Sequence, residues 1–157
     1  MTAAFTCRTE LDAAPERAFE LSRSIDAHLG SMANTDERAV DGVTSGLIGL
    51  GETVTWRARH FGVVWTMTSR ITALDAPRTF TDEQVRGPFA DFRHVHVFEP
   101  LEGPGGRDGT LMLDHIAFAA PLGPLGLIVE RVALTRHLRR LIESRNAWLA
   151  STLRHAQ

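Results

Sequence analysis

The sequence has no lysine and no tyrosine, and its only cysteine is Cys7. The seventeen basic residues are therefore all arginine. A single cysteine excludes an internal disulfide and is typical of a reducing compartment, so we expect a cytoplasmic location. The net charge of −2 argues against a nucleic-acid-binding protein, because such proteins usually carry net positive charge.

The chain also lacks an apolar run of the roughly 18 residues that a membrane span requires. Its first residues contain neither the basic nor the apolar segment of an export signal. Hydrophobic residues make up 43% of the chain and charged residues 23%, which is ordinary for a soluble globular protein. A chain of 157 residues is long enough to bury its own core, so we expect a single domain over residues 1–157.

The last quarter of the chain, from Pro121 to Leu153, has the pattern of one long amphipathic helix. Two prolines, Pro121 and Pro124, stand at or before its first turn, where a helix tolerates proline. The apolar residues of one face are Leu134, Leu138, Leu141, Ile142, Trp148, Leu149 and Leu153. The charged residues predicted on the other side are Arg136, Arg139, Arg140, Glu143 and Arg145. A helix with such a continuous apolar face needs a broad apolar surface to cover that face.

The rest of the chain predicts such a surface, because most of it alternates with the period of β-strands. A first strand ends near Leu11, and Pro15 begins the first of two short helices, the second of which ends near Gly30. The further strands are predicted at 37–41, 53–61, 63–74, 78–86, 90–99 and 110–120. Short turns between successive strands indicate an antiparallel meander.

This order of elements resembles the helix-grip fold of the START-like superfamily, which includes polyketide cyclases and pathogenesis-related allergens. The resemblance is nearest to a bacterial cyclase/dehydrase-like branch of ligand-binding proteins. The residues that carry it are the run from Trp56 to Gly62, the run from Phe80 to Gln84, Gly87-Pro88-Phe89, the run from His94 to Phe98, and Asp114 ahead of the run from Pro121 to Gly126. The resemblance implies an α+β fold in which a curved antiparallel sheet of about six to seven strands wraps around the long C-terminal helix. It also implies a cavity between sheet and helix for an apolar or aromatic small molecule.

The strand phases place several polar groups on the face that carries large aromatic residues. His94 and His96 share a face with Phe92 and Phe98, and Asp114 lies on the next strand. Apolar walls with a few convergent polar groups are the usual composition of a small-molecule site. We therefore predict contacts to a small hydrophobic or aromatic ligand from Trp56, His60, Asp82, Gln84, Phe92, His94, His96, Met112, Asp114 and Phe118.

Four other interpretations of the sequence stay open at this point. The polar groups could satisfy one another and only order the sheet. The protein could instead be a cyclase, dehydratase or isomerase, in which His94 or His96 pairs with Asp82 or Asp114 as a general base. The His-x-His spacing could present two metal ligands, with Asp114 as a third, but no further ligand is fixed, so we predict neither a metal nor another cofactor. The arginines of the last helix could face a membrane or an anionic partner, although we expect them to be solvated.

The sequence contains no signal that fixes the oligomeric state, and a homodimer is compatible with it.

Overall fold

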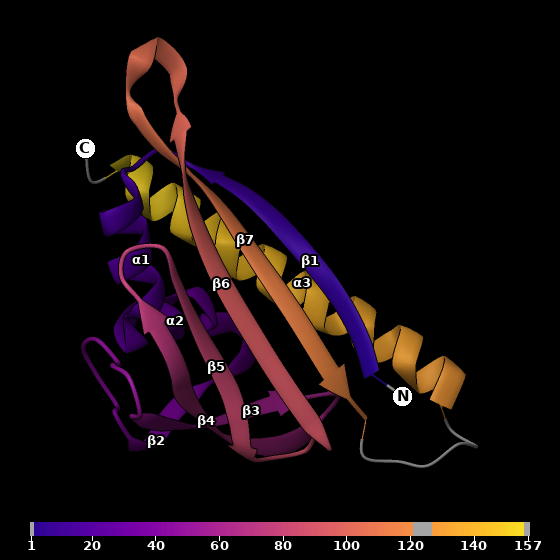
Figure 1. Ribbon diagram of the computed structural model, residues 1–157. Helices are drawn as coiled ribbons and strands as arrows, with labels where there is room; N and C mark the ends of the chain where they lie inside the picture. Colours follow the sequence, from indigo (N-terminus) through magenta and orange to yellow (C-terminus); the bar gives the residue numbers. More distant parts are fainter. Residues whose placement is uncertain (1, 121–126, 156–157) are drawn as a thin grey trace.

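The computed structural model describes residues 2–120 and 127–155 and, in the C-terminal helix, the side chains from residue 132 onward (Figure 1). Its elements in chain order are β1 (Thr2–Leu11), α1 (Pro15–Arg23), α2 (Ile25–Ser31), η1 (Ala33–Thr35), β2 (Arg38–Gly42), β3 (Thr53–His60), β4 (Val63–Asp75), β5 (Thr79–Arg86), β6 (Asp91–Glu102), η2 (Pro104–Gly106), β7 (Asp108–Ala119) and α3 (Leu127–His155). The predicted strands and helices are therefore present, with their boundaries moved by a few residues.

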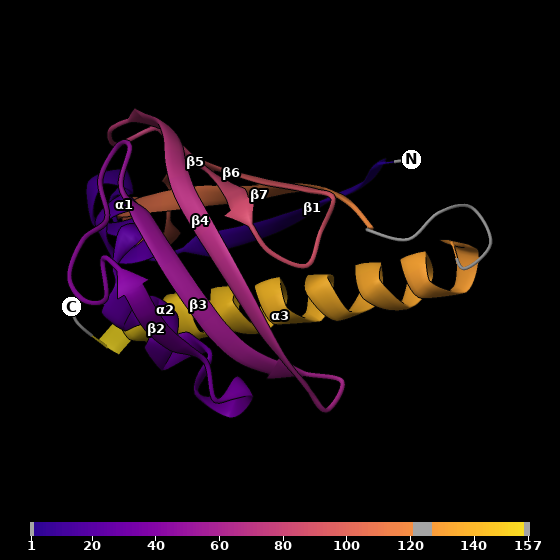
Figure 2. The ribbon, with the colours of Figure 1, turned by 90° about the horizontal axis from the view of Figure 1, so that it is seen from below.

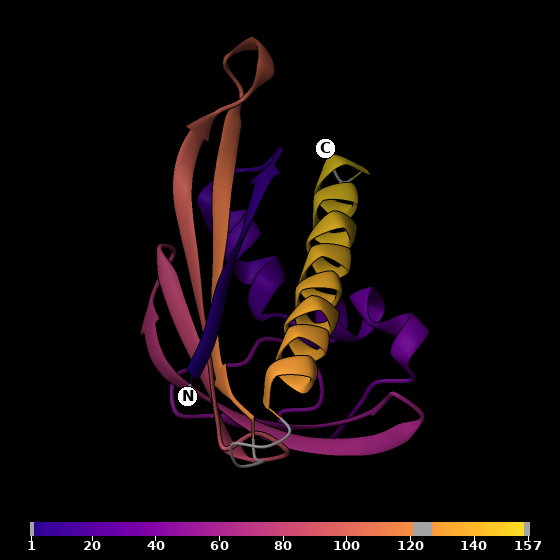
Figure 3. The ribbon, with the colours of Figure 1, turned by 90° about the vertical axis from the view of Figure 1, so that its right-hand side faces the viewer.

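The described strands form a seven-stranded antiparallel sheet in the order β1-β7-β6-β5-β4-β3-β2. Apart from the pairing of β1 with β7, each strand pairs with its neighbours in sequence, which confirms the predicted meander. The helices α1 and α2 join the two edge strands, β1 and β2. Seen from the side, the sheet curves, and α3 lies within the curve (Figure 3). The structure thus confirms the predicted α+β fold.

Helix α3 presents the predicted apolar face to the rest of the molecule. Leu149 and Leu153 are buried, and the Trp148 ring packs against Gly30 of α2. Helix α2 lies beside the C-terminal half of α3 (Figure 2). A Cβ atom at residue 30 would lie 2.9 Å from the Trp148 ring, so glycine at this position allows the two helices to approach. The predicted helix start at Pro121 and Pro124 lies outside the described residues.

One residue of this helix contradicts the prediction. Arg145 was expected on the solvent side, but only 4% of its surface is exposed, and its side chain points inward. Its position is three or four residues from Leu141, Ile142, Trp148 and Leu149, so helical geometry places it on the apolar face. An acidic partner inside the protein, described below, stabilises its charge there.

The core consists of two apolar clusters on either side of a polar belt. Phe98 of β6 and Met112 of β7 belong to the first cluster, and Phe92 and Phe118 of the same strands belong to the second. Between these pairs, β6 carries His94 and His96, and β7 carries Asp114. We define the polar belt as these three residues together with Arg145 and Asn146 of α3, all of them buried.

Cys7 is buried in the second cluster, and burial raises the pKa of its thiol. Within the described residues, no helix is both long and apolar enough to cross a membrane.

We expect Leu149→Ala to lower the free energy of unfolding by about 2–5 kcal/mol, because the Leu149 side chain is almost fully buried in the larger cluster. Val132→Ala on the exposed side of the same helix is the matched control and should change it by less than about 0.5 kcal/mol. Urea unfolding of both variants measures the difference. An equal loss of unfolding free energy in Leu149→Ala and Val132→Ala would contradict the packing of α3 into the core.

Candidate ligand-binding cavity

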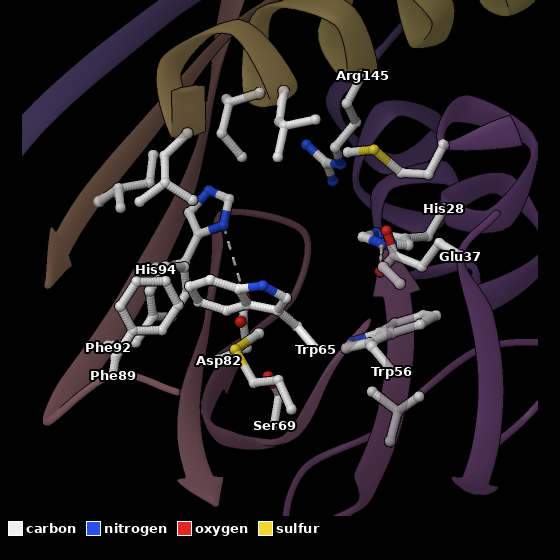
Figure 4. Close-up of a pocket in the computed structure, with 18 of the residues that line it drawn as sticks. His28, Glu37, Trp56, Trp65, Ser69, Asp82, Phe89, Phe92, His94 and Arg145 are labelled. Carbon is white, nitrogen blue, oxygen red and sulfur yellow. Dashed lines mark hydrogen bonds and ion pairs between the residues drawn. The ribbon is translucent and has the colours of Figure 1, made fainter. Parts of the chain in front are cut away.

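A cavity of about 200 Å³ lies between the inner face of the sheet and α3. Its walls are mostly apolar, and they come from the three α-helices, from strands β3 to β7, and from the segments before β2, β3 and β6. Trp65 crosses the middle of the cavity, with His94 and Asp82 on one side of it and Trp56 on the other (Figure 4). The main apolar lining residues are Ile48, Val54, Met67, Ile71, Phe89, Leu134, Leu138, Leu141 and Ile142.

Six of the ten residues predicted to contact a ligand line this cavity: Trp56, His60, Asp82, Phe92, His94 and His96. The alternation along β6 brings three of them there. Because β6 pairs with β7 without a register shift from Asp91 to Glu102, Phe92, His94 and His96 all keep the inward orientation. A contact of these six residues with a ligand stays a prediction.

The other four predicted residues do not line the cavity. Met112 and Phe118 are almost completely buried among core side chains: the Ser22 hydroxyl donates to Met112 Sδ, and Phe118 packs edge-on against Phe89. Gln84 is occupied by the turn before β6, where its side-chain amide donates to the Phe89 carbonyl and accepts from the Phe89 amide.

Asp114, the fourth, is fully buried behind the histidines and holds the polar belt together. Its Oδ1 accepts a hydrogen bond of 2.8 Å from His94 Nε2, and its Oδ2 accepts one of 2.7 Å from Asn146 Nδ2. Arg145 Nη1 lies 3.6 Å from Oδ1 and also donates to Asn146 Oδ1, while Nη2 donates to the Ser22 carbonyl. This carboxylate therefore connects β7 to β6 and to α3, and through Arg145 to α1.

The electrostatics of the belt follow from these contacts. Burial alone would raise the pKa of Asp114, but the hydrogen bond from His94 and the adjacent His96 outweigh burial and hold this pKa well below its usual value. Burial and the neighbouring His96 lower the pKa of His94 despite the carboxylates nearby. His94 is therefore neutral near pH 7, and its bond to Asp114 places the proton on Nε2, which leaves Nδ1 as an acceptor.

Asp82 lies on the cavity side of the same histidines. Its Oδ2 accepts from His96 Nε2 at 3.0 Å and lies 3.9 Å from His94 Nδ1. Burial would raise the pKa of Asp82, but the hydrogen bond from His96 and the nearby charges lower it overall. His96 Nδ1 lies 3.0 Å from Asp114 Oδ1 at an angle unsuited to a hydrogen bond, and it has no hydrogen-bond partner among the described residues. Asp82, His94 and His96 thus form a compact polar corner of the cavity.

Comparison with solved structures identifies the architecture. Zhui aromatase/cyclase from Streptomyces sp. R1128 matches 98% of this chain over 94% of its own, with a TM-score of 0.77 and 14% identity. TTHA0849 from Thermus thermophilus matches 99% of both chains, with a TM-score of 0.74 and 17% identity. Major latex-like protein 151 from Panax ginseng matches 93% of this chain over 96% of its own, with a TM-score of 0.61 and 16% identity. The protein has the helix-grip fold.

At these identities the likeness concerns the fold alone. No protein-family model matches the sequence, and no curated protein matches it. The predicted helix-grip architecture is confirmed, while the chemistry of this helix-grip cavity has to be argued from its own residues.

Several lining residues of the helix-grip cavity were missed by the sequence analysis. Trp65, Met67, Ser69 and Ile71 alternate along β4 and all face the cavity. Trp65 Nε1 and Ser69 Oγ are buried and have no hydrogen-bond partner among the described residues. The alternation of β4 was visible in the sequence, but the pattern did not show which of its two faces points inward.

A second polar group lies across the cavity from the polar corner. His28 Nε2 pairs with Glu37 Oε1 at 3.0 Å, and the His28 ring stacks on Trp56 with a centroid distance of 4.2 Å (Figure 4). The two side chains come from α2 and from the segment before β2, which the sequence did not bring together. The cavity therefore has polar groups on opposite sides and aromatic rings between them.

A pair of histidines joins the sheet to α3 at the end of β3. His60 Nδ1 and His137 Nε2 lie 3.1 Å apart, and Phe61 packs against the His137 ring. One of the two rings donates and the other accepts, so the contact requires at least one neutral ring. Burial lowers the pKa of both; His60 and Arg140 lower that of His137 further, whereas Glu37 opposes the shift at His60.

These shifts make stability depend on pH. A histidine whose pKa is lower in the folded state binds fewer protons there than in the unfolded chain, so stability is full above the unfolded pKa of about 6.5 and declines as the pH falls below it. We expect the thermal midpoint of unfolding to be lower at about pH 5.5 than at about pH 7.5. The decrease should be smaller in His137→Gln than in the wild type, because this variant lacks one histidine whose pKa is lowered by folding. Thermal unfolding at the two pH values measures this. The same decrease in both proteins would contradict a role of the His60–His137 contact.

Proposed function

We propose that the protein binds a small, largely hydrophobic or aromatic molecule in the cavity between the sheet and α3, as a carrier or sensor. The observation that carries this proposal is the pair of unpartnered groups on β4, Trp65 Nε1 and Ser69 Oγ. Buried polar groups in proteins are nearly always hydrogen-bonded, so two such groups on one apolar cavity wall call for a partner that enters the cavity. The fold supports an aromatic ligand, because one neighbour of the same architecture is named an aromatase/cyclase.

The polar atoms also restrict the chemistry of the ligand. The indole N–H of Trp65 can only donate, so it needs an acceptor such as an oxygen atom. His94 Nδ1 and the Asp82 carboxylate on the same side of the cavity accept, so they favour a group that donates. A hydroxyl group donates and accepts at once. We therefore favour an aromatic molecule that carries a hydroxyl group.

A comparison of two probes, 2-naphthol and naphthalene, tests this proposal. We expect the wild type to bind 2-naphthol more tightly than naphthalene, and Ser69→Ala and Trp65→Phe each to weaken 2-naphthol binding by about two- to tenfold, the value of one hydrogen bond. Naphthalene binding should change little in Ser69→Ala, because that substitution removes a hydroxyl group and no apolar surface. Calorimetric titration at one salt concentration measures the affinities.

Ser69→Ala has a further expected property that separates binding from folding. The free energy of unfolding should stay equal or increase, because the substitution removes a buried hydroxyl group that has no partner. The matched control is Ser45→Ala on an exposed loop, which should alter neither affinity nor stability. An unchanged preference for 2-naphthol in both β4 variants would contradict the proposed site.

A second candidate function rests on the His94–Asp114 pair. A neutral imidazole oriented by a buried carboxylate, with its free nitrogen toward a cavity, has the arrangement of a general base. Such a base could remove a proton next to a carbonyl group during cyclisation, dehydration or isomerisation of a bound compound. Conversion of an aromatic β-diketone by the wild type but not by His94→Gln, measured by mass spectrometry, would favour this function over a carrier. The absence of conversion by the wild type would reject it for that class of substrate.

A further inference from the structure

We propose that Asp82, His94 and His96 also form a binding site for a divalent transition-metal ion on the cavity wall. One ligand atom from each residue lies within 4.8 Å of the other two, and these three residues are the one such group found in the described part of the chain. All three line the cavity, so an ion held there would keep coordination positions open toward it. The sequence analysis considered Asp114 as the third ligand and predicted no metal, because no further ligand was fixed.

The proton positions support a cation at this point. His94 donates through Nε2 to Asp114, so its lone pair on Nδ1 lies on the side of Asp82, 3.9 Å from Oδ2. His96 Nε2 lies 3.0 Å from the same oxygen. Two imidazole nitrogens and a carboxylate oxygen therefore converge. Without the proton on His96 Nε2 all three atoms would be acceptors, which repel one another unless a cation lies between them. The proton that His96 donates to Asp82 takes that place in the hydrogen-bonded form, and a metal ion would replace it.

Asp114 supplies the supporting contacts that metal sites usually have. Histidines that bind a metal commonly donate their other ring nitrogen to a carboxylate, which fixes the orientation of the ring. Asp114 accepts from His94 and lies 3.0 Å from the remaining nitrogen of His96, while Asn146 holds its second oxygen. Asp114 would therefore be a positioning residue and not a ligand.

The charge of the surroundings favours a cation over an anion. The carboxylates of Asp82 and Asp114 both lie against the two imidazole rings, and they outnumber the single guanidinium, that of Arg145, that lies beside them. Two imidazoles and one carboxylate suit ions of intermediate softness such as Zn²⁺ or Fe²⁺, whereas Mg²⁺ and Ca²⁺ prefer oxygen ligands. The proposed site is thus one for a first-row transition ion.

Titration of untagged, chelator-treated protein with Co²⁺ and Zn²⁺ tests this inference, with no organic ligand present. We expect one equivalent to bind, with visible Co²⁺ absorption of a site containing nitrogen and oxygen ligands. His94→Gln and Asp82→Asn should each remove most of the affinity, because each deletes a ligand. Asp114→Asn should weaken binding about ten- to a hundredfold without loss of stoichiometry, as expected of a positioning residue. Circular dichroism establishes that each variant is folded.

His137→Gln is the matched control, because it removes a histidine from the cavity lining without touching the proposed ligands. It should leave affinity and stoichiometry unchanged. The inference is overturned if the wild type binds no stoichiometric metal, or if folded His94→Gln and Asp82→Asn bind as tightly as the wild type. These results are independent of the naphthol titrations, so failure of the metal site and failure of the proposed ligand binding can be told apart.

Discussion

The buried carboxylate of Asp114 is the interaction on which the arrangement of this protein depends. A charge with no exposed surface is stable only when its partners remain in place, and here they come from β6 and α3. Removing one member of such a network typically costs about 3–5 kcal/mol, because the others are left buried without a partner. Arg145 extends the same network to α1 by donating to the Ser22 carbonyl. The position of α3 relative to the sheet is therefore fixed by polar contacts as well as by apolar packing.

This network also explains where the cavity lies. In the described residues, α3 packs chiefly against β1 and the two short helices, and Arg139 adds a bond to the Thr6 carbonyl and a contact with the Phe5 ring. The inner faces of β3, β4 and β5 are left without comparable contact with the helix and become cavity wall. A helix held at one side of a curved sheet thus leaves a space at the other side, and the polar belt forms one boundary of that space.

Much of this could be predicted from the sequence because it depends on local periodicity. The alternation in β6 and β7 correctly placed Phe92, His94 and His96 inside, and the three-and-four spacing identified the long helix. The prediction was wrong for Arg145, where the charge of the residue was given more weight than its position on the helix. That charge is buried because Asp114 lies opposite, and a contact between residues 31 positions apart in the sequence (145 − 114) leaves no local pattern.

The remaining site residues depended on three-dimensional information of the same kind. Gln84 was in phase with Asp82, but the turn before β6 engages its side chain. Trp65 and Ser69 were in phase with each other, and only the pairing of β4 with its neighbours shows that they face the cavity. The sequence thus predicted the fold and the residues of the polar corner, while the unpartnered groups that indicate a ligand became apparent only in the structure.

The central claim is that the cavity itself, and not an exposed apolar surface, receives the small molecule. Isotope-edited nuclear Overhauser measurements with 2-naphthol on the labelled protein test it most directly. The account predicts contacts between naphthol protons and the methyl groups of Met67, Ile71 and Leu138, which line the cavity from opposite sides. Contacts confined to exposed residues such as Leu50 and Val63, or no contacts at saturating naphthol, would contradict it.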